Sequence, residues 1–431
     1  MAFRLNLVGV CTISVIFILS LLASYRFTST SFTTEYFRPR EGAALLRNTK
    51  NYKSYNNYYK HRYQDGGGGA NGFMAPENAT ILIEDILNYQ REKVTEEMLY
   101  FEYPDGKHGV RARKLSDLTP ELGGKPMRSI IFTTWRSGST FLGDILNAMP
   151  GNFYHYEPLL HYEIVQIRGA PYAGKALEHL RKLLTCNYTD MEDYLNYGKE
   201  HNNLFTHNTR LWKHCRLFTN YCFIPKFLEP FCKLFPLQSM KVVRLRAALA
   251  QVLLDDPTLN VRIILLIRDP RGTMQSRRHR DWCPGQPDCD HVPTVCADMV
   301  ADYHAARNLT RLYPDRFHVI RYEDLSLNPY DMTNRILAFY GLPMDEQVQD
   351  FLDSHTKLNI GGVSSTFRDS KSAPFHWTKE LDFDDVAQIQ DQCTEAMKLW
   401  GYKPVNDPDE LHNNFNPLLD FKLSAAPTKS S

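Results

Sequence analysis

One segment of the chain places a cation, a glycine and three hydroxyl side chains between two apolar stretches. The segment Trp135-Arg-Ser-Gly-Ser-Thr140 follows the β-type run SIIF and leads into the helix-like run TFLGDILNAM. At a strand-to-helix junction the first backbone N–H groups of the helix are unpaired, and the helix dipole favours an anion. Gly138 lets the backbone curl around anionic oxygens, and Arg136 adds a permanent positive charge. These residue types in this order predict a phosphate-binding loop.

A second segment repeats this arrangement later in the chain. Arg268 follows the apolar run VRIILLI, and Ser276 lies eight residues further on, in a helix expected to begin near Pro270. Ser276 then falls about two turns into the helix, where it and Arg268 could hold one anion together. Two such sites at the ends of two strands predict a ligand with phosphates at separate positions. The usual loop of nucleoside triphosphatases is not indicated, because the pattern G-x-x-x-x-G-K-[ST] is absent from the sequence.

Alternating β-type and helix-like runs must position these two loops. The β-type runs SIIFTTW, MKVVRL, VRIILLI and FHVIRYEDL are each followed by a helix-like run, and Gly341 is suited to end the last helix. Strands separated by helices indicate a parallel sheet with helices on both faces. Ligands of such sheets bind outside the carboxyl ends of the strands. The predicted fold class is therefore α/β, a single P-loop-like three-layer domain with a central parallel sheet, preceded by a transmembrane helix and a stem.

The two loops together resemble the nucleotide-binding motifs of sulfotransferases that use 3′-phosphoadenosine 5′-phosphosulfate (PAPS). The first motif of that family reads T-x-[KR]-S-G-[ST]-[ST], and its second has an Arg followed eight residues later by a Ser, as found here. The segments YEPLLH, KVVRLR, IRDPRG, VIRYEDL and AMKLWGYKPV extend the resemblance, over residues 125–405, to the Golgi carbohydrate 6-O-sulfotransferases. The resemblance implies that the nucleotide is bound by Thr134, Trp135, Arg136, Ser137, Gly138, Ser139, Thr140, Arg268 and Ser276, with Arg368 as a further phosphate contact.

The resemblance also implies a reaction, the in-line transfer of a sulfuryl group from PAPS to a sugar hydroxyl. Arg136 would stabilise the charge that develops on the leaving phosphate oxygen, since a guanidinium effectively never gives up its proton. Glu157 in HYEPLLH is expected to remove the acceptor proton, and His155 and His161 are left open as alternatives. The favoured acceptor is the 6-hydroxyl of N-acetylglucosamine, or that of galactose or N-acetylgalactosamine, in glycoprotein or proteoglycan glycans. No metal ion is expected.

Other charged residues have structural and functional interpretations. Lys241 and Arg244 lie three apart on a predicted strand, so their side chains should face opposite sides of the sheet. Glu323 is interpreted as structural, because its strand is expected to be central and its carboxylate paired. The run Arg277–Arg280 is either a site that attracts a polyanionic glycan or a solvated helix end.

An apolar stretch near the start of the chain indicates a membrane anchor. Residues 5–25 contain Asn6 as their one strongly polar residue, and a stretch of about 20 residues can cross a bilayer as a helix. Leu21 and Leu22 make a poor exit for a cleavable signal peptide. We expect a type II single-pass Golgi membrane protein with a lumenal catalytic domain. Its expected parts are a cytoplasmic tail (1–4), a transmembrane signal anchor (5–25), a stem (26–120), a sulfotransferase domain (125–405) and a C-terminal tail (406–431).

Composition agrees with a lumenal body and with glycan and membrane partners. The formal net charge is only +1, so no nucleic-acid partner is expected. Eight of the nine cysteines follow the apolar stretch, and this even number fits up to four disulfides whose pairing is left open. Paired zinc-ligand spacing of the C-x-x-C or H-x-x-x-H kind is absent from the sequence. Homodimer formation is left open. The acceptors of N-linked glycosylation are Asn78, Asn187 and Asn308.

Three other functions would share part of this pattern. A phosphoryl-transfer enzyme would require ATP and Mg²⁺, which the missing loop lysine disfavours. A catalytically silent glycan-binding protein on the same fold should lack a phosphate-binding residue, yet Arg136, Ser139, Arg268 and Ser276 are all present. A protein-tyrosine sulfotransferase would share the two motifs and differ in its acceptor.

Overall fold

The computed structural model describes residues 76–360, 366–413 and 415–423, which belong to one compact unit. The predicted anchor at 5–25 lies outside the described residues. Among the helices that are described, none combines the length and the apolar composition needed to cross a bilayer.

A five-stranded parallel sheet forms the centre of this unit. The strand order is β2 (Asn152–Tyr156), β3 (Leu237–Val242), β1 (Met127–Phe132), β4 (Val261–Ile267) and β5 (Phe317–Arg321). Strands β1, β3 and β4 are buried along their whole length, as expected for strands that are covered on both faces. The predicted α/β class with a central parallel sheet is confirmed. Strand β2 was not predicted.

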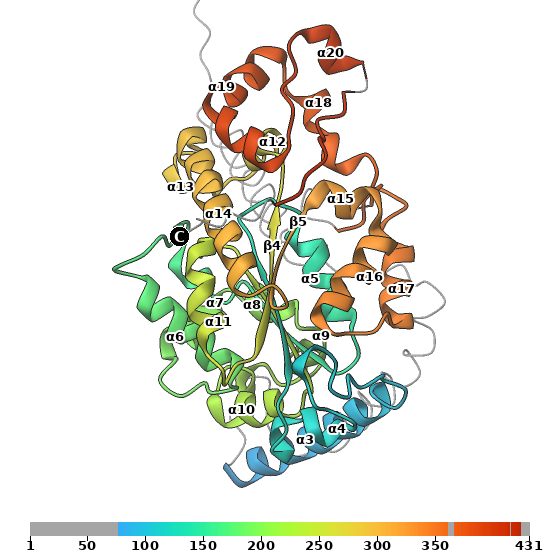
Figure 1. Ribbon diagram of the computed structural model, residues 1–431. Helices are drawn as coiled ribbons and strands as arrows, with labels where there is room; N and C mark the ends of the chain where they lie inside the picture. Colours follow the sequence, from blue (N-terminus) through green and yellow to red (C-terminus); the bar gives the residue numbers. More distant parts are fainter. Residues whose placement is uncertain (1–75, 361–365, 414, 424–431) are drawn as a thin grey trace, which may run out of the picture. The chain divides into compact units, whose positions relative to one another are not determined.

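Helices cover both faces of the sheet (Figure 1). Helices α5 (Ser139–Ala148), α16 (Pro329–Tyr340) and α17 (Glu346–His355) lie on one side, and α11 (Ala250–Asp255) and α14 (Val292–Leu312) lie on the other. Helix α5 contacts β2 and β3, whereas α11 contacts β4 and α14 contacts β5. Gly341 ends α16 with a φ of 77°, as its position in the sequence predicted.

The other helices surround these layers. The α-helices are α3 (Pro76–Glu97), α4 (Leu115–Leu118), α6 (Ala173–Leu184), α7 (Glu192–Glu200), α8 (Asn203–Thr206), α9 (Thr209–Cys215), α10 (Pro225–Lys233), α12 (Pro270–Arg278), α13 (Pro287–Asp290), α15 (Tyr322–Leu327), α18 (Trp377–Glu380), α19 (Phe383–Trp400) and α20 (Pro408–His412). The 3₁₀ helices are η1 (Lys107–Gly109), η2 (Pro120–Leu122), η3 (Leu160–Tyr162), η4 (Thr219–Tyr221), η5 (Ala247–Leu249) and η6 (Ala373–Phe375).

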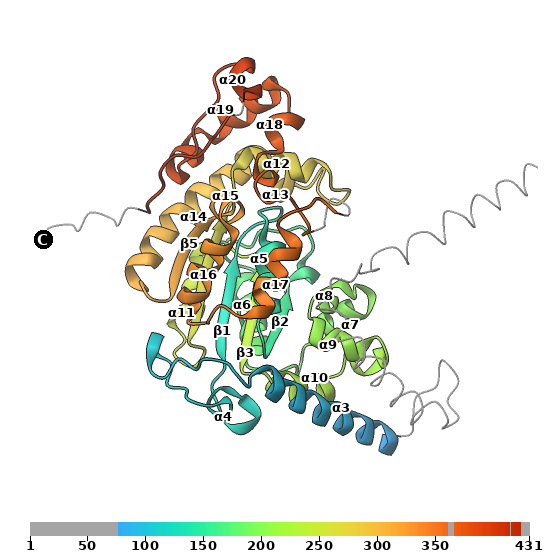
Figure 2. The same ribbon diagram turned by 90° about the vertical axis from the view of Figure 1, so that its right-hand side faces the viewer.

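The folded body extends beyond the predicted domain bounds of 125 and 405. Helix α3 lies beside α10 (Figure 2), and its Leu82 is completely buried. Glu97, the last residue of α3, forms an ion pair with Arg210 in which Nη2 and Oε2 are 2.7 Å apart. At the other end of the chain, Tyr402 forms an antiparallel bridge with Leu418. Segments expected to be stem and tail therefore contribute to the body.

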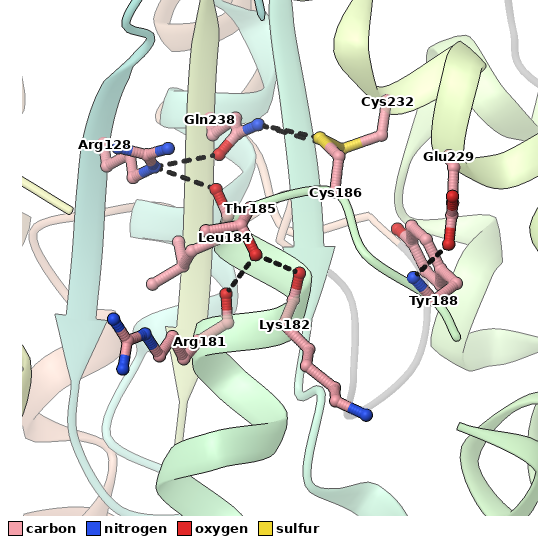
Figure 3. Close-up of a disulfide and its surroundings, with 10 residues drawn as sticks. All are labelled: Arg128, Arg181, Lys182, Leu184, Thr185, Cys186, Tyr188, Glu229, Cys232 and Gln238. Atoms are coloured by element: carbon pink, nitrogen blue, oxygen red, sulfur yellow. Dashed lines mark hydrogen bonds between the residues drawn. A yellow bond between two sulfur atoms is a disulfide. The ribbon is translucent and has the colours of Figure 1, made fainter. Parts of the chain in front are cut away.

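Disulfides join all eight cysteines of the described residues. The pairs are Cys186–Cys232, Cys215–Cys222, Cys283–Cys289 and Cys296–Cys393. Figure 3 shows the first pair beside Gln238 of β3, whose side-chain amide donates a hydrogen bond to Cys186 Sγ. Nearby, Arg128 of β1 donates from Nε to the carbonyl of Leu184. The predicted number of up to four is reached. Of the pairings that the sequence left open, one joins the end of α6 to α10 and another joins α14 to α19, while the other two close short stretches of chain.

Candidate active site

The loop between β1 and α5 is shaped by two residues in left-handed backbone conformations. Arg136 has a φ of 65° and Gly138 a φ of 82°. A Cβ atom at Gly138 would lie 2.1 Å from the ring of Tyr322, so only glycine fits there. Because α5 begins at Ser139, the unpaired N–H groups of its first turn lie at the carboxyl end of β1. This strand-to-helix turn has the backbone geometry that the residue pattern predicted, and such a turn is suited to an anion.

A cavity of about 960 Å³ opens at the carboxyl ends of the strands. Its lining comes mainly from the ends of the five strands and the segments that follow them, from residues 197–203 and from the segment 366–380. All but two of the predicted site residues line this cavity: Trp135, Arg136, Gly138, Ser139, Thr140, Glu157, Arg268, Ser276 and Arg368. Residues far apart in the sequence are thus collected around a single space, although their individual roles stay predictions.

The two predicted phosphate motifs meet inside the cavity. Arg268 donates from Nη1 to the carbonyl oxygen of Arg136 across 2.8 Å, and Arg136 donates from Nε to Ser276 Oγ across 2.9 Å. Ser276 lies in the second turn of α12, as the spacing from Pro270 predicted. Arg268 Nε is buried and has no hydrogen-bond partner among the described residues. One ligand can therefore reach both motifs, and Arg268 Nε is available to donate a hydrogen bond to it.

Positive charge is concentrated at this meeting point. Burial lowers the pKa of Arg136 to about 10, and the nearby Arg280 and Arg268 lower it further by charge repulsion. Because a guanidinium carries a permanent positive charge, these three groups repel one another in a partly buried space. A ligand that carries several anionic oxygens would relieve this repulsion. The donors and charges at the site thus fit a nucleotide with phosphates at both ends.

Two predicted nucleotide contacts support the loop from behind. The side chain of Ser137 is completely buried, and its hydroxyl donates to the carbonyl of Thr134 across 2.9 Å. The hydroxyl of Thr134 in turn accepts a hydrogen bond from Arg277 Nη2 across 2.8 Å. Neither Thr134 nor Ser137 lines the cavity. Their side chains hold the shape of the loop, so a nucleotide contact from either residue would have to come from its backbone.

Arg277 is a site residue that the sequence patterns did not identify. It was grouped with an exposed or glycan-binding run, but it is 1% exposed, so both interpretations are wrong for this residue. Its guanidinium donates from Nη1 to the carbonyl of Cys289 across 2.7 Å and from Nε to the carbonyl of Trp135 across 3.2 Å. The sequence signal was the spacing of four residues between Thr273 and Arg277, which places both side chains on one face of α12, and the structure shows that this face is buried.

Glu157, the predicted base, is held between two cations. Its Oε1 accepts from Lys241 Nζ across 3.0 Å, and its Oε2 accepts from Arg244 Nη1 across 2.9 Å. Burial raises the pKa of Glu157, but Lys241 and Arg244 outweigh it and lower the pKa to about 2. With this pKa the carboxylate is a weak base unless one of the two contacts is released. The base role therefore stays a prediction that requires such a release.

The expected placement of Lys241 and Arg244 on opposite sides of the sheet is wrong. Strand β3 ends at Val242, so the alternation of side chains along the strand does not extend to Arg244. The chain turns after the strand and brings both cations to the carboxylate of Glu157. Lys241 also donates to the hydroxyl of Thr140 across 3.2 Å, which links this cluster to the first turn of α5.

Neither histidine alternative for the base lines the cavity. His155 is 4% exposed on β2, and burial lowers its pKa to about 3. Burial also lowers the pKa of His161 to about 4, with a further contribution from the charge of Arg244. Histidines that the sequence analysis did not consider as the base do line the cavity, namely His201, His279, His355 and His376.

Glu323 is structural, but for a different reason from the one expected. It lies in α15, directly after β5, and β5 is an edge strand and not a central one. Its Oε1 accepts from the backbone N–H of Asp269 across 2.9 Å, and its Oε2 accepts from the Tyr402 hydroxyl across 2.8 Å. Burial, followed by the charge of Asp269, raises the pKa of Glu323 to about 7. Through these two hydrogen bonds, Glu323 connects the loop after β4 to Tyr402 in the C-terminal part of the body.

The predicted modification and metal sites can be placed only in part. Asn187 and Asn308 are exposed, and Asn78 lies in the first turn of α3. In the part of the chain that the structure describes, no group of three or more His, Cys, Asp or Glu side chains could hold a metal ion.

Comparison with known proteins agrees with this geometry. Residues 130–346, which include both phosphate motifs, match the Sulfotransferase family. Carbohydrate sulfotransferase 1 of Danio rerio is 28% identical, and the match covers 68% of this chain and 82% of that protein. Carbohydrate sulfotransferase 3 of Mus musculus is 26% identical over 68% of this chain and 71% of its own length. Carbohydrate sulfotransferase 6 of Homo sapiens is 27% identical over 68% and 85%.

Proposed function

The chain belongs to the sulfotransferase family, and on that premise we propose that it transfers the sulfuryl group of PAPS to a hydroxyl of a carbohydrate. The observation that supports this proposal most directly is the contact between the two phosphate motifs. Arg268 donates to the carbonyl of Arg136, and Arg136 donates to Ser276, so one nucleotide with phosphates at both ends can be held by both loops. The names of the similar proteins, which are carbohydrate sulfotransferases, support a carbohydrate acceptor.

The proposed roles of the residues follow from charge and position. PAPS supplies the activated sulfur. Arg268 and Ser276 bind its 3′-phosphate, while Arg136 and the first turn of α5 bind the 5′ end and stabilise negative charge on the leaving oxygen. Arg368, which lines the same cavity, is a further phosphate contact. Glu157 removes the acceptor proton after the acceptor or the nucleotide has displaced one of its two cationic partners.

The proposed acceptor is the 6-hydroxyl of N-acetylglucosamine, with galactose and N-acetylgalactosamine as the alternatives. The purified full-length chain, supplied with radiolabelled PAPS, should sulfate members of a glycan panel, and disaccharide analysis should identify the sugar and the hydroxyl. A tyrosine-containing acidic peptide belongs in the same panel, because labelling of that peptide alone would assign a protein-tyrosine sulfotransferase instead. Binding of 3′,5′-adenosine bisphosphate without transfer to any acceptor would indicate a catalytically silent protein.

We further propose that residues 5–25 anchor the protein in the Golgi membrane as a type II protein with a lumenal body. Four disulfides support an oxidising compartment for that body. With epitope tags at both ends, protease treatment of intact Golgi vesicles should remove the N-terminal tag and spare the C-terminal one. The opposite result would reverse the orientation. Light scattering of the purified chain would decide whether it forms a homodimer.

A further inference from the structure

The cavity has a second wall, on the side of β2, that contains none of the nucleotide motifs. This wall consists of residues within 160–164, which follow β2, and of Tyr197 in α7, His201 directly after α7, and Asn203 at the start of α8. Trp282, in the loop after α12, also lines the cavity. Among the described residues, those that line this wall offer aromatic, amide and carboxylate groups and no lysine or arginine. Such a surface is suited to a neutral polar molecule with an apolar face, which is the chemistry of a sugar ring.

Trp282 is an exposed aromatic ring with a fixed position. It is 40% exposed, and its ring meets that of Trp135 edge-on at 6.2 Å between centroids. The next residue, Cys283, is bonded to Cys289, and both half-cystines pack with Trp135 and Val243 in a buried cluster. The indole is therefore held rigidly while one side stays open. The partly positive C–H groups on one face of a pyranose are attracted to the negative face of such a ring.

The wall on the side of β2 supplies a second aromatic group and neutral hydrogen-bonding groups. Tyr197 and His201 stand one helical turn apart, and their rings are stacked at 4.0 Å between centroids with 13° between the planes. Asn203 begins α8 directly after this pair and also lines the cavity. Its amide can donate to and accept from sugar hydroxyls without adding charge. Together these groups can recognise a hydroxylated ring and fix its orientation.

Glu163 places a carboxylate on the same wall in an unusual backbone conformation. Its φ of 59° and ψ of −140° are rare for a residue other than glycine. The carbonyl of Glu163 accepts from Arg244 Nε across 2.7 Å, and the same Arg244 holds Glu157. Arg244 thus contacts both the strained backbone of Glu163 and the proposed base, Glu157. The side chain of Glu163 is exposed and lines the cavity. Backbone strain that is stabilised by a neighbouring site residue indicates a functional position.

The positive charges near this wall are already engaged with other groups. The nearest to Glu163 is Arg244, which donates to the carbonyl of Glu163 and forms an ion pair with the carboxylate of Glu157. Arg280 lies two residues before Trp282 and lines the cavity, but it acts on Arg136 by charge repulsion. It is therefore part of the cationic group that faces the nucleotide phosphates. An acidic sugar on the second wall would meet the carboxylate of Glu163, and close approach of two negative charges is unfavourable in a partly enclosed space.

We propose that Trp282, the Tyr197–His201 pair and Glu163 form the acceptor subsite, and that Glu163 selects uncharged sugars over uronic acids and sugars already sulfated. This inference rests on the proposed function, because it assigns the acceptor of the same reaction. Trp282 and the Tyr197–His201 pair bind the sugar ring, and Glu163 acts by repelling anionic neighbours in the glycan. Neither role involves contact with the reacting sulfur.

The test compares a neutral and an anionic acceptor with the full-length chain and radiolabelled PAPS. The neutral acceptor is an oligosaccharide of galactose and N-acetylglucosamine, and the anionic one is chemically desulfated chondroitin. We expect kcat/KM to be at least tenfold higher for the neutral acceptor. Glu163→Gln should reduce this ratio at least threefold, and Glu192→Gln, which changes an exposed carboxylate on α7 outside the cavity, should leave it unchanged. A preference that is the same in wild type and Glu163→Gln would overturn the role of Glu163.

The tryptophan is tested through acceptor binding. Trp282→Ala should raise KM for the neutral acceptor at least tenfold with KM for PAPS unchanged, and Trp282→Phe should recover most of the loss. Quenching of tryptophan fluorescence by the neutral oligosaccharide, with 3′,5′-adenosine bisphosphate bound, should disappear in Trp282→Phe. An acceptor KM unaffected by Trp282→Ala would refute the subsite. Failure of the proposed function would look different, because the oligosaccharide would quench the fluorescence while no labelled glycan formed.

Discussion

Arg277 donates a hydrogen bond to the hydroxyl of Thr134 across 2.8 Å, so the helix after β4 supports the loop after β1 from behind. The same guanidinium contacts the carbonyls of Trp135 and Cys289. On the cavity side, Arg268 and Arg136 connect the same two loops. The two phosphate motifs are therefore parts of one hydrogen-bonded unit. A change in the support should weaken nucleotide binding even though Arg277 is too deeply buried to reach the nucleotide itself.

Replacement of Arg277 by lysine should weaken binding of 3′,5′-adenosine bisphosphate at least tenfold, about 1.4 kcal/mol. An ammonium group cannot reproduce the forked contacts of the guanidinium, and each buried acceptor left unpaired costs about 1–3 kcal/mol of stability. Titration calorimetry and thermal unfolding measure the two effects. The matched control is Arg278→Lys, which alters a half-exposed ion pair with Asp385 and should change either quantity by less than about 1 kcal/mol. Normal nucleotide affinity in Arg277→Lys would show that the loop does not depend on this support.

Arg268→Gln should remove most of the discrimination between nucleotides with and without a 3′-phosphate. A charge-assisted hydrogen bond contributes about 1.5–3 kcal/mol, so affinity for 3′,5′-adenosine bisphosphate should fall roughly 10- to 100-fold. Affinity for 5′-AMP should change little, which provides the internal control. Equal losses for both ligands would mean that Arg268 acts only through its contact with the Arg136 carbonyl.

Glu157→Gln should reduce sulfuryl transfer by about 10²- to 10⁴-fold, the usual contribution of a general base. Affinity for 3′,5′-adenosine bisphosphate should stay within a few-fold of wild type. The variant should also unfold more easily, because breaking a buried ion pair costs about 3–5 kcal/mol and Lys241 has no other carboxylate partner among the contacts described. His161→Gln is the control, since His161 does not line the cavity. Near-normal turnover by Glu157→Gln, or its loss in His161→Gln, would assign the base elsewhere.

Acid should destabilise the fold through three buried histidines. Burial lowers the pKa values of His155, His179 and His214 to about 3. Below the unfolded pKa of about 6.5 the unfolded chain binds protons that the native state does not, so stability falls as the pH decreases from 6.5 toward 3. Each such histidine contributes up to about 1.4 kcal/mol per pH unit.

Unfolding in denaturant, followed between pH 7 and pH 5, measures this dependence. His179→Gln should make the dependence on pH shallower, whereas His304→Gln, a change at an exposed position, should leave it as in wild type. A stability that does not change over this range would mean that the three rings are solvated in solution.

The backbone of the loop around Gly138 could be predicted from sequence because it depends on neighbouring residues. Gly138 and the hydroxyl residues around it encode the turn, and the helix that follows begins where its apolar pattern begins. The positions of Arg268 and Ser276 could also be predicted, since Arg268 directly follows β4 and Ser276 lies eight residues further on, in α12. In the segments after β1 and after β4, the local residue types determine where the strand ends and the helix begins. That backbone in turn sets the positions of the hydrogen-bond donors.

The surroundings of Glu157 could not be predicted, because they depend on contacts between distant segments. Its two cationic partners lie 84 and 87 residues away in the sequence. Strand β2, which leads into Glu157, is five residues long, lies at the edge of the sheet and has the sequence NFYHY, without the aliphatic run that marked the other strands. Strand β3 begins three residues earlier than its apolar run, since it includes the buried polar residues Gln238 and Ser239. Burial of such residues is set by tertiary packing and is not visible in a local pattern.

The bond between Cys296 and Cys393 joins α14 to α19 across 97 residues of chain. The enclosed stretch contains Arg368 and Tyr322 of the cavity lining, along with the exposed Leu358. A protease that cuts once within this stretch would therefore produce two fragments that still migrate as one molecule until a thiol reductant is added. Proteolytic maturation or damage there would go unnoticed on a non-reducing gel, and would be revealed as two bands on a reducing one.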